Sequence, residues 1–260
     1  MWNQGPYVGT SGFSYKSFVG PLYPQGLPQT RWLDHYVTAF NTVELNNTFY
    51  NMPKPATVDK WREKAPPGFL YSVKVSRYLT HIRRLREIEE PLDRVYRLME
   101  RLQPNLGPLL FQLPPTLPRN DVLLDTFLPL LSSSFVHVVE FRHASWFVPE
   151  VVERLDRAGV SMASVSSPTL RTGVLAAGPV IYLRFHGEER MFASCYSEDD
   201  LARWTKEALN VLRARKMSKT SSLFAYFNND AEGHAVPNAR ILAQLLGSKP
   251  PRSQSKSPLF

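Results

Sequence analysis

Short apolar runs alternate with longer amphipathic stretches along this 260-residue chain. The apolar runs are rich in β-branched and aromatic residues and are bounded by polar positions, which is typical of buried strands. Eight of them are predicted as strands: Tyr7–Gly9, Thr42–Leu45, Leu70–Val75, Pro108–Gln112, the start of His137–Trp146, Ser161–Val165, Val180–Phe185 and Leu223–Phe227.

The stretches between these strands mostly have a helical period. Leu33, Tyr36, Val37 and Phe40 recur at i, i+3, i+4 and i+7, which predicts one apolar helix face. Ser197 precedes three acidic residues, as at the start of a helix. Further helices are predicted at Ala56–Glu63, Leu92–Leu102, Val122–Leu131, Val151–Ala158 and Asn238–Leu246. Only a poor helical pattern follows the strand that ends at Val165.

Eight strands separated mostly by helices, at a spacing of roughly 30 residues, predict an α/β protein with a (β/α)8 TIM-type barrel. A doubly wound open sheet is the competing architecture, but the chain has no dinucleotide-binding glycine pattern. Residues 1–246 are therefore predicted as one domain. Residues 247–260 are rich in Ser, Pro and Lys and predict a basic, disordered tail.

Composition narrows the classes of partner. A formal charge of +8 favours anionic small molecules or nucleic acid, although a merely basic surface is the alternative. The single cysteine, Cys195, excludes an internal disulfide and a multi-cysteine zinc site. No apolar stretch approaches the roughly 20 residues of a membrane span, and the N-terminus does not resemble a signal peptide. A cytoplasmic protein without a membrane partner is expected.

Polar residues follow the apolar strands where each would reach the carboxyl-terminal mouth of the barrel, and there they would meet. Burial of such groups is unfavourable unless they pair, so a purely structural ion-pair network is the alternative to a functional site. The candidates are Glu44, Lys74, Gln112, Glu140, Arg142, His143, Arg184, His186, Asn228 and Asn229, with His81 from a loop.

The surplus of cations among these candidates suits an anion such as a phosphate or a carboxylate. Lys74, Arg142 and Arg184 are the expected anion ligands. The remaining substrate-binding candidates are His81, Gln112, Asn228 and Asn229.

Acid–base chemistry is assigned to carboxylates and imidazoles. Glu140 or Glu44 is the expected general base, and His143 or His186 would donate or relay a proton. Together with His81, these residues could instead form a divalent metal site, but no HxH or HExxH spacing supports one. The cofactor is left open.

Three functions are compatible with these patterns. The leading hypothesis is a hydrolase-like enzyme, of phosphoesterase type, that acts on a phosphate-bearing or other anionic substrate. A nucleic-acid-binding module is the second, because arginines cluster at Arg77–Arg86 and the loop aromatics Phe13, Tyr15, Phe18 and Tyr23 could stack on bases. Those aromatics could equally form a hydrophobic lid on the barrel. A non-catalytic scaffold is the third.

Seven short motifs lie at the strand ends and in the loops that follow them. They are GTSGFSY at Gly9–Tyr15, TVELNNTFY at Thr42–Tyr50, VKVS…TH at Val73–His81, FQLPP at Phe111–Pro115, EFRHASW at Glu140–Trp146, RFHG at Arg184–Gly187 and FNNDAEGHAVPNA at Phe227–Ala239. Together they resemble the YecE-like domain-of-unknown-function family (number 72). The resemblance extends from Val8 to Leu246 and implies a TIM barrel, but no particular reaction, because the family has no settled activity.

Overall fold

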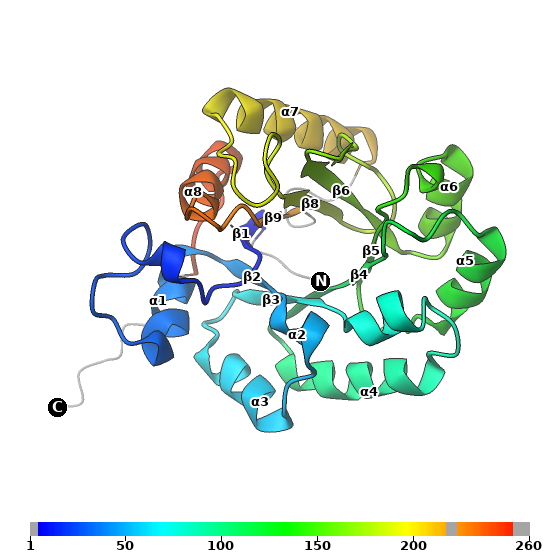
Figure 1. Cartoon of the computed structure of the whole chain (residues 1–260), viewed down its shortest axis with the longest axis horizontal. Helices are drawn as coiled ribbons and strands as arrows, with labels where there is room; N and C mark the ends of the chain where they lie inside the picture. The colour runs from blue at the N-terminus through cyan, green and yellow to red at the C-terminus, as the bar shows by residue number, and fades with distance from the viewer. Residues whose placement is uncertain (1–4, 217–222, 252–260) are drawn as a thin grey trace.

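Eight parallel strands curve into a nearly closed barrel in the computed structural model, which describes residues 5–216 and 223–251 (Figure 1). The strands are β1 (Tyr7–Thr10), β2 (Thr42–Leu45), β3 (Leu70–Lys74), β4 (Leu106–Gln112), β5 (His137–Glu140), β6 (Ser161–Ser167), β8 (Ile181–Phe185) and β9 (Leu223–Phe227). Their order is β1-β9-β8-β6-β5-β4-β3-β2. The predicted TIM-type barrel is confirmed.

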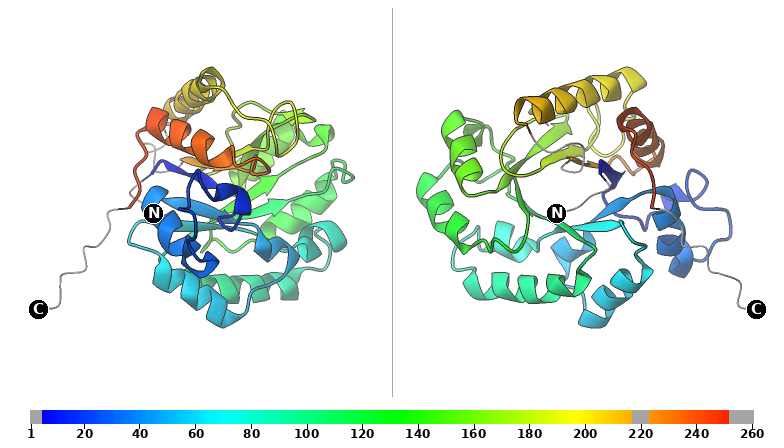
Figure 2. Two further views of the ribbon diagram at one scale, coloured as in Figure 1. Left: turned by 60° about the vertical axis from the view of Figure 1, so that its left-hand side comes forward. Right: turned by 180° about the vertical axis from the view of Figure 1, so that it is seen from behind.

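Helices form the outer layer, with their apolar faces on the strands (Figures 1 and 2). A capping box between Ser197 and Asp200 begins the longest of them, as the acidic sequence predicts. The helices are α1 (Trp32–Ala39), α2 (Asn47–Tyr50), α3 (Pro55–Lys64), α4 (Glu89–Met99), α5 (Asp121–Phe127), α6 (Pro149–Arg157), α7 (Glu198–Ala214) and α8 (Ala235–Leu246).

The connection from β6 to β8 lacks a helix. It contains only β7 (Leu170–Arg171), a short strand antiparallel to β6, followed by an irregular stretch. The poor helical pattern that follows Val165 is thereby explained, because this unit of the barrel replaces its helix with an extended loop.

The barrel closes between β1 and β2 through side chains more than through a backbone ladder. One bridge joins Ser11 to Glu44. Below it, the Tyr36 hydroxyl accepts from the Thr10 N–H at 2.9 Å and donates to the Thr42 carbonyl at 3.1 Å. A Cβ atom on the intervening Gly9 would lie 2.1 Å from that carbonyl, so only glycine fits here.

Every second side chain of each strand points inward, and these side chains fill the barrel interior. The lower interior is apolar, with Leu70, Leu110, Val138 and Phe224 in one buried cluster. Higher up, the Tyr226 hydroxyl lies 2.7 Å from Thr42 Oγ1 and 2.6 Å from Ser72 Oγ. Successive inward positions therefore change from apolar to polar toward the carboxyl-terminal mouth.

The loop aromatics after β1 mainly form a packed lid. Phe18 and Tyr23 are fully buried, and Phe13 packs against the same core. Tyr15 is partly buried, and its hydroxyl donates to the Ser11 carbonyl at 2.8 Å. The lid alternative therefore accounts for most of this loop.

The first residues of the predicted tail pack on the domain. Gly247 has φ of 68° and ends α8, and Ser248 Oγ donates to the Pro6 carbonyl at 2.7 Å. The rest of the tail, 252–260, lies outside the described residues. Within the described ranges, no helix is both long and apolar enough to span a bilayer.

Candidate functional site

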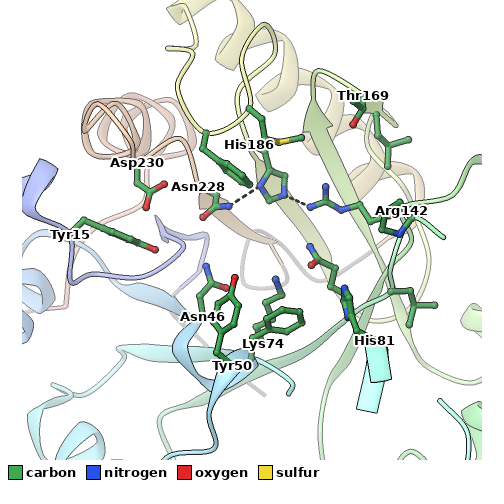
Figure 3. A pocket seen from close by; sticks show the side chains of 17 residues that line it. Tyr15, Asn46, Tyr50, Lys74, His81, Arg142, Thr169, His186, Asn228 and Asp230 are labelled. Atoms are coloured by element: carbon green, nitrogen blue, oxygen red, sulfur yellow. Dashed lines mark hydrogen bonds between the residues drawn. The ribbon is translucent and has the colours of Figure 1, made fainter. Parts of the chain in front are cut away.

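A polar cavity of about 520 Å³ lies at the carboxyl-terminal mouth of the barrel (Figure 3). Its wall combines residues from strand ends with residues from the segments that follow each of the eight barrel strands. The lining residues are Tyr15, Asn46, Phe49, Tyr50, Lys74, His81, Gln112, Leu113, Pro115, Arg142, Thr169, Leu170, His186, Met191, Phe192, Asn228 and Asp230. We call this cavity the mouth pocket.

Five strands each contribute a predicted residue to the mouth pocket. Lys74 and Gln112 are the last residues of β3 and β4. Arg142, His186 and Asn228 lie one or two positions beyond the ends of β5, β8 and β9. Because alternate residues of a strand point to the same side, these side chains continue the inward rows of the barrel.

The floor beneath the pocket is a buried ion pair between Arg184 and Glu44. Arg184 Nε and Nη2 donate to the two carboxylate oxygens at 3.0 and 2.6 Å. The same carboxylate accepts from Ser11 Oγ at 2.8 Å and from the Tyr182 hydroxyl at 2.7 Å. Glu44 is fully buried and accepts four hydrogen bonds, so both oxygens are occupied by the protein.

Glu140 extends this floor toward Arg142. Its carboxylate forms close ion pairs with Arg184 Nη1 and Arg142 Nε and accepts from Gln112 Nε2 at 2.9 Å. Burial raises the pKa of Glu140, but the two guanidinium groups outweigh burial and hold it well below its ordinary value. At neutral pH Glu140 is therefore ionised and a weak base.

These contacts revise the roles expected for three residues. Arg184 is 1% exposed, does not line the mouth pocket, and uses its donors on Glu44, Glu140 and His186. The geometry gives no support to Arg184 as an anion ligand or to either glutamate as the general base. The structural ion-pair network, which is the alternative expectation from sequence, accounts for all three.

His186 links the floor to the pocket wall. Its Nε2 lies 2.9 Å from Arg142 Nη2, which can only donate, so Nε2 is the accepting nitrogen. Nδ1 then carries the proton and faces the side-chain amide of Asn228 at 3.0 Å, which accepts once its oxygen is turned to the ring. Burial and then Arg184 and Arg142 hold the pKa of His186 well below its ordinary value. His186 is thus a neutral hydrogen-bonding group.

Lys74 is the buried cation that the network leaves unpaired. Its Nζ lies 3.9 Å from the centre of the Phe49 ring, and no described residue accepts a hydrogen bond from it. Burial first, and then repulsion from Arg184, lowers the pKa of Lys74 to about 7. In Figure 3 its amine points into the middle of the pocket.

His81 forms part of the wall beside Lys74. Its Nδ1 lies 2.9 Å from Thr80 Oγ1, and its ring meets Phe49 edge to face. Burial, followed by Lys74 and Arg77, lowers the pKa of His81 to about 4, so it is neutral at physiological pH. It can offer a hydrogen bond to a ligand but no charge.

Besides Glu44, Glu140 and Arg184, two further predicted residues lie outside the mouth pocket. His143 Nδ1 accepts from the Ser145 N–H at 3.3 Å and caps the short helix that follows it. Asn229 is buried and donates to the Ser194 carbonyl at 2.9 Å and to Asn238 Oδ1 at 2.8 Å. Both contacts shape loops around the pocket, and neither supports a direct role with substrate.

The alternative of a divalent metal site gains no support. Within residues 5–216 and 223–251, no group of three or more His, Cys, Asp or Glu side chains could hold a metal ion. His81 and His186 reach the pocket, but the two glutamates face arginines beneath it.

Five polar pocket residues are not among the candidates predicted from sequence: Tyr15, Asn46, Tyr50, Thr169 and Asp230. Asp230 lies across the pocket from Arg142 in Figure 3, and burial raises its pKa. Its position directly after the predicted pair Asn228–Asn229 is the signal that could have identified it. Asn46 follows β2 at the same spacing from Glu44 as Arg142 from Glu140, and its Oδ1 is buried without a partner among the described residues.

A parallel α/β barrel of eight strands defines a TIM-barrel protein. Its polar pocket lies at the carboxyl-terminal ends of the strands, where TIM-barrel proteins have their sites. The chain belongs to the family described as protein of unknown function DUF72, which it matches over residues 7–258. The family expected from the motifs is thereby confirmed.

Named relatives and solved structures agree with this assignment. The UPF0759 protein YecE of Escherichia coli K12 is 32% identical over 174 residues, which cover 63% of this chain and 62% of that protein. The UPF0759 protein YunF of Bacillus subtilis is 24% identical, and the match covers 94% of YunF and 92% of this chain. A DUF72 family structure from Thermotoga maritima is 29% identical, with a TM-score of 0.78 and coverage of 93% of this chain and 98% of that one.

Proposed function

We propose that this protein is an enzyme that binds a small anionic substrate in the mouth pocket. The observation that carries the proposal is a pair of unused cationic donors at one pocket. Lys74 Nζ and Arg142 Nη1 have no hydrogen-bond partner among the described residues. The carboxylates beneath them, Glu44 and Glu140, are occupied by other donors.

An anion would complete the hydrogen bonding of this pocket. Arg142 is 16% exposed and anchored through its Nε and Nη2, so Nη1 is held in place without a large loss of rotamer freedom on binding. Gln112 and Asn228 also line the pocket with side-chain amide groups. A phosphate or carboxylate accepts several such donors at once.

Acid–base groups favour an enzyme over a passive binding protein. Lys74, with a pKa near 7, exchanges a proton close to neutral pH, and burial raises the pKa of Asp230 on the opposite wall. Shifted titratable groups that converge on a cavity are typical of catalytic sites. We therefore propose Lys74 and Asp230 as the acid–base groups, in place of Glu44, Glu140 and His143.

The proposal is tested by thermal unfolding of the full chain with inorganic phosphate, glycerol 3-phosphate and glycerol. A ligand at 100 times its dissociation constant should add about 2.7 kcal/mol, or about 5 to 10 °C in Tm for a chain of this size. We expect inorganic phosphate and glycerol 3-phosphate to stabilise the protein, and glycerol to have no effect.

Two lysine variants locate the binding site. Lys74→Met should remove most of the stabilisation by phosphate, whereas Lys64→Met, at a half-exposed ion pair with Asp34, should retain it. No stabilisation by any phosphorylated compound, or equal stabilisation of both variants, would reject the mouth pocket as an anion site.

A second candidate function is binding of single-stranded nucleic acid beside the same mouth. Arg77 and Arg86 are exposed beside the segment Tyr78–Ile82, which contains the pocket residue His81. Tyr78 in that segment and Tyr50 in the pocket wall are exposed aromatics. This combination of cations and stacking groups is typical of single-strand binding surfaces.

A further inference from the structure

We propose that Lys74 is a nucleophile that forms an imine with a small aldehyde or ketone carrying a carboxylate or phosphate group. The inference rests on the proposed function for the anionic part of the ligand and adds a carbonyl group and a covalent step. A buried amine directed into a cavity, without a hydrogen-bond acceptor, is the feature that points to this chemistry.

The position of Lys74 separates it from the other lysines that the structure describes. It ends β3, is 9% exposed, and lines the mouth pocket. Lys54, Lys60 and Lys206 lie exposed on the outer helices or beside them, and Lys64 is half-buried in an ion pair. No carboxylate is paired with Lys74, so nothing in the described chain holds its proton by direct contact.

Its surroundings favour the neutral, nucleophilic amine. Burial and the neighbouring guanidinium groups of Arg184 and Arg142 disfavour a further positive charge, and together they place the pKa near 7. The neutral amine is therefore a much larger fraction of Lys74 near pH 7 than of an ordinary lysine, whose pKa is 10.5.

The covalent step requires only side chains of the mouth pocket and the carbonyl compound. The Lys74 nitrogen lone pair attacks the carbonyl carbon, the C–N bond forms, and a proton passes from nitrogen to oxygen to give a carbinolamine. The hydroxyl group then takes up a proton, from solvent or from Asp230, whose pKa is raised by burial, and leaves as water, so that the protonated imine remains. Arg142 Nη1 would hold the anionic group of the substrate on the facing wall.

The experiment traps this imine in the full chain near pH 7. The protein is incubated with glyoxylate or with neutral glycolaldehyde, each with sodium cyanoborohydride, and modified lysines are quantified by peptide mass spectrometry. We expect glyoxylate to modify Lys74 about 10-fold or more above Lys54 and Lys60, because the lowered pKa of Lys74 makes its amine more nucleophilic near pH 7. Inorganic phosphate should suppress that adduct, and glycolaldehyde should show weaker selectivity.

Control variants make the result unambiguous. Lys64→Met should retain the Lys74 adduct and Lys74→Met should show only the low labelling of surface lysines. Adducts spread evenly over the exposed lysines of the wild type would overturn the inference. If phosphate still stabilises the protein in that case, the proposed anion site stands and only the imine chemistry fails.

Discussion

Two buried cations of the barrel differ because of their partners. Arg184 and Lys74 both lie at the ends of inward rows, where burial disfavours a charge. Arg184 contacts the carboxylates of Glu44 and Glu140, which raise its pKa above the ordinary value despite burial. The Lys74 amine lies over the ring of Phe49 without a carboxylate partner among the described residues, and its pKa falls to about 7. Pairing therefore makes one cation structural and leaves the other available.

The Lys74 amine should give the protein a characteristic pH dependence of stability. Its pKa is about 7 in the folded chain and near 10.5 when unfolded, so the unfolded state binds more protons between these values. The free energy of unfolding should therefore rise with pH across this window, by at most about 1.4 kcal/mol per pH unit from this group. Below pH 7 both states are protonated and the contribution is constant.

Urea unfolding of the wild type and Lys74→Met at several pH values isolates this contribution, because other groups cancel in the difference. The wild type should gain stability relative to the variant as the pH rises from about 7 to about 10. A difference that stays constant over this range would show that Lys74 is charged in the folded protein.

At the scale of elements, the junction of β1 and β2 sets the shape of the mouth. Tyr36 from α1 supplies a hydroxyl between the two strands, and Asn41 Oδ1 accepts from the Val8 N–H at 3.0 Å. The junction also holds Ser11 against Glu44 at 2.8 Å, directly beneath the pocket. Barrel closure and the buried floor therefore depend on the same few contacts.

Gly9→Ala should destabilise the protein by more than about 3 kcal/mol, because the new Cβ would overlap the Thr42 carbonyl at 2.1 Å and separate the strands. Gly26→Ala is the matched control. Gly26 has φ of 78° in open space, so its substitution should cost only about 1 kcal/mol through backbone strain. Chemical denaturation of both variants measures the contrast, and equal losses would contradict a tight junction.

At the scale of the whole molecule, the formal net charge is +8. Near the mouth pocket, some arginines have partners and others do not. Arg83 forms an ion pair with Glu87, and Arg84 donates to the Thr116 carbonyl at 2.7 Å. Arg77 and Arg86 are exposed, and their side chains have no described partner. The surface beside the pocket therefore has two arginine side chains that could bind the phosphates of a polyanion.

If this surface binds single-stranded DNA, the affinity should fall steeply with salt. Replacement of Arg77 and Arg86 by Gln should lower the slope of log K against log salt by about 1.4, or 0.7 for each lost phosphate contact. Arg94→Gln with Arg213→Gln, on the outer helices α4 and α7, is the matched control. Absence of binding at low salt, or binding that is insensitive to salt, would remove this second candidate function.

The barrel, its family and six of the residues that line its mouth are predictable from the sequence alone. Period-two and helical patterns are local, and a parallel barrel brings strand ends together whatever the details of packing. Lys74, His81, Gln112, Arg142, His186 and Asn228 line the pocket as the sequence leads one to expect. Even the missing helix after β6 is visible as a weak pattern.

Only the tertiary structure decided which of these groups are free. Glu44, Glu140 and Arg184 look like catalytic candidates in sequence, but they satisfy one another beneath the pocket. Lys74 and Asp230 lie far apart along the chain and become a convergent pair through folding. The charge state of a buried group depends on desolvation and on neighbours across the barrel, and neither is encoded within a few residues of it.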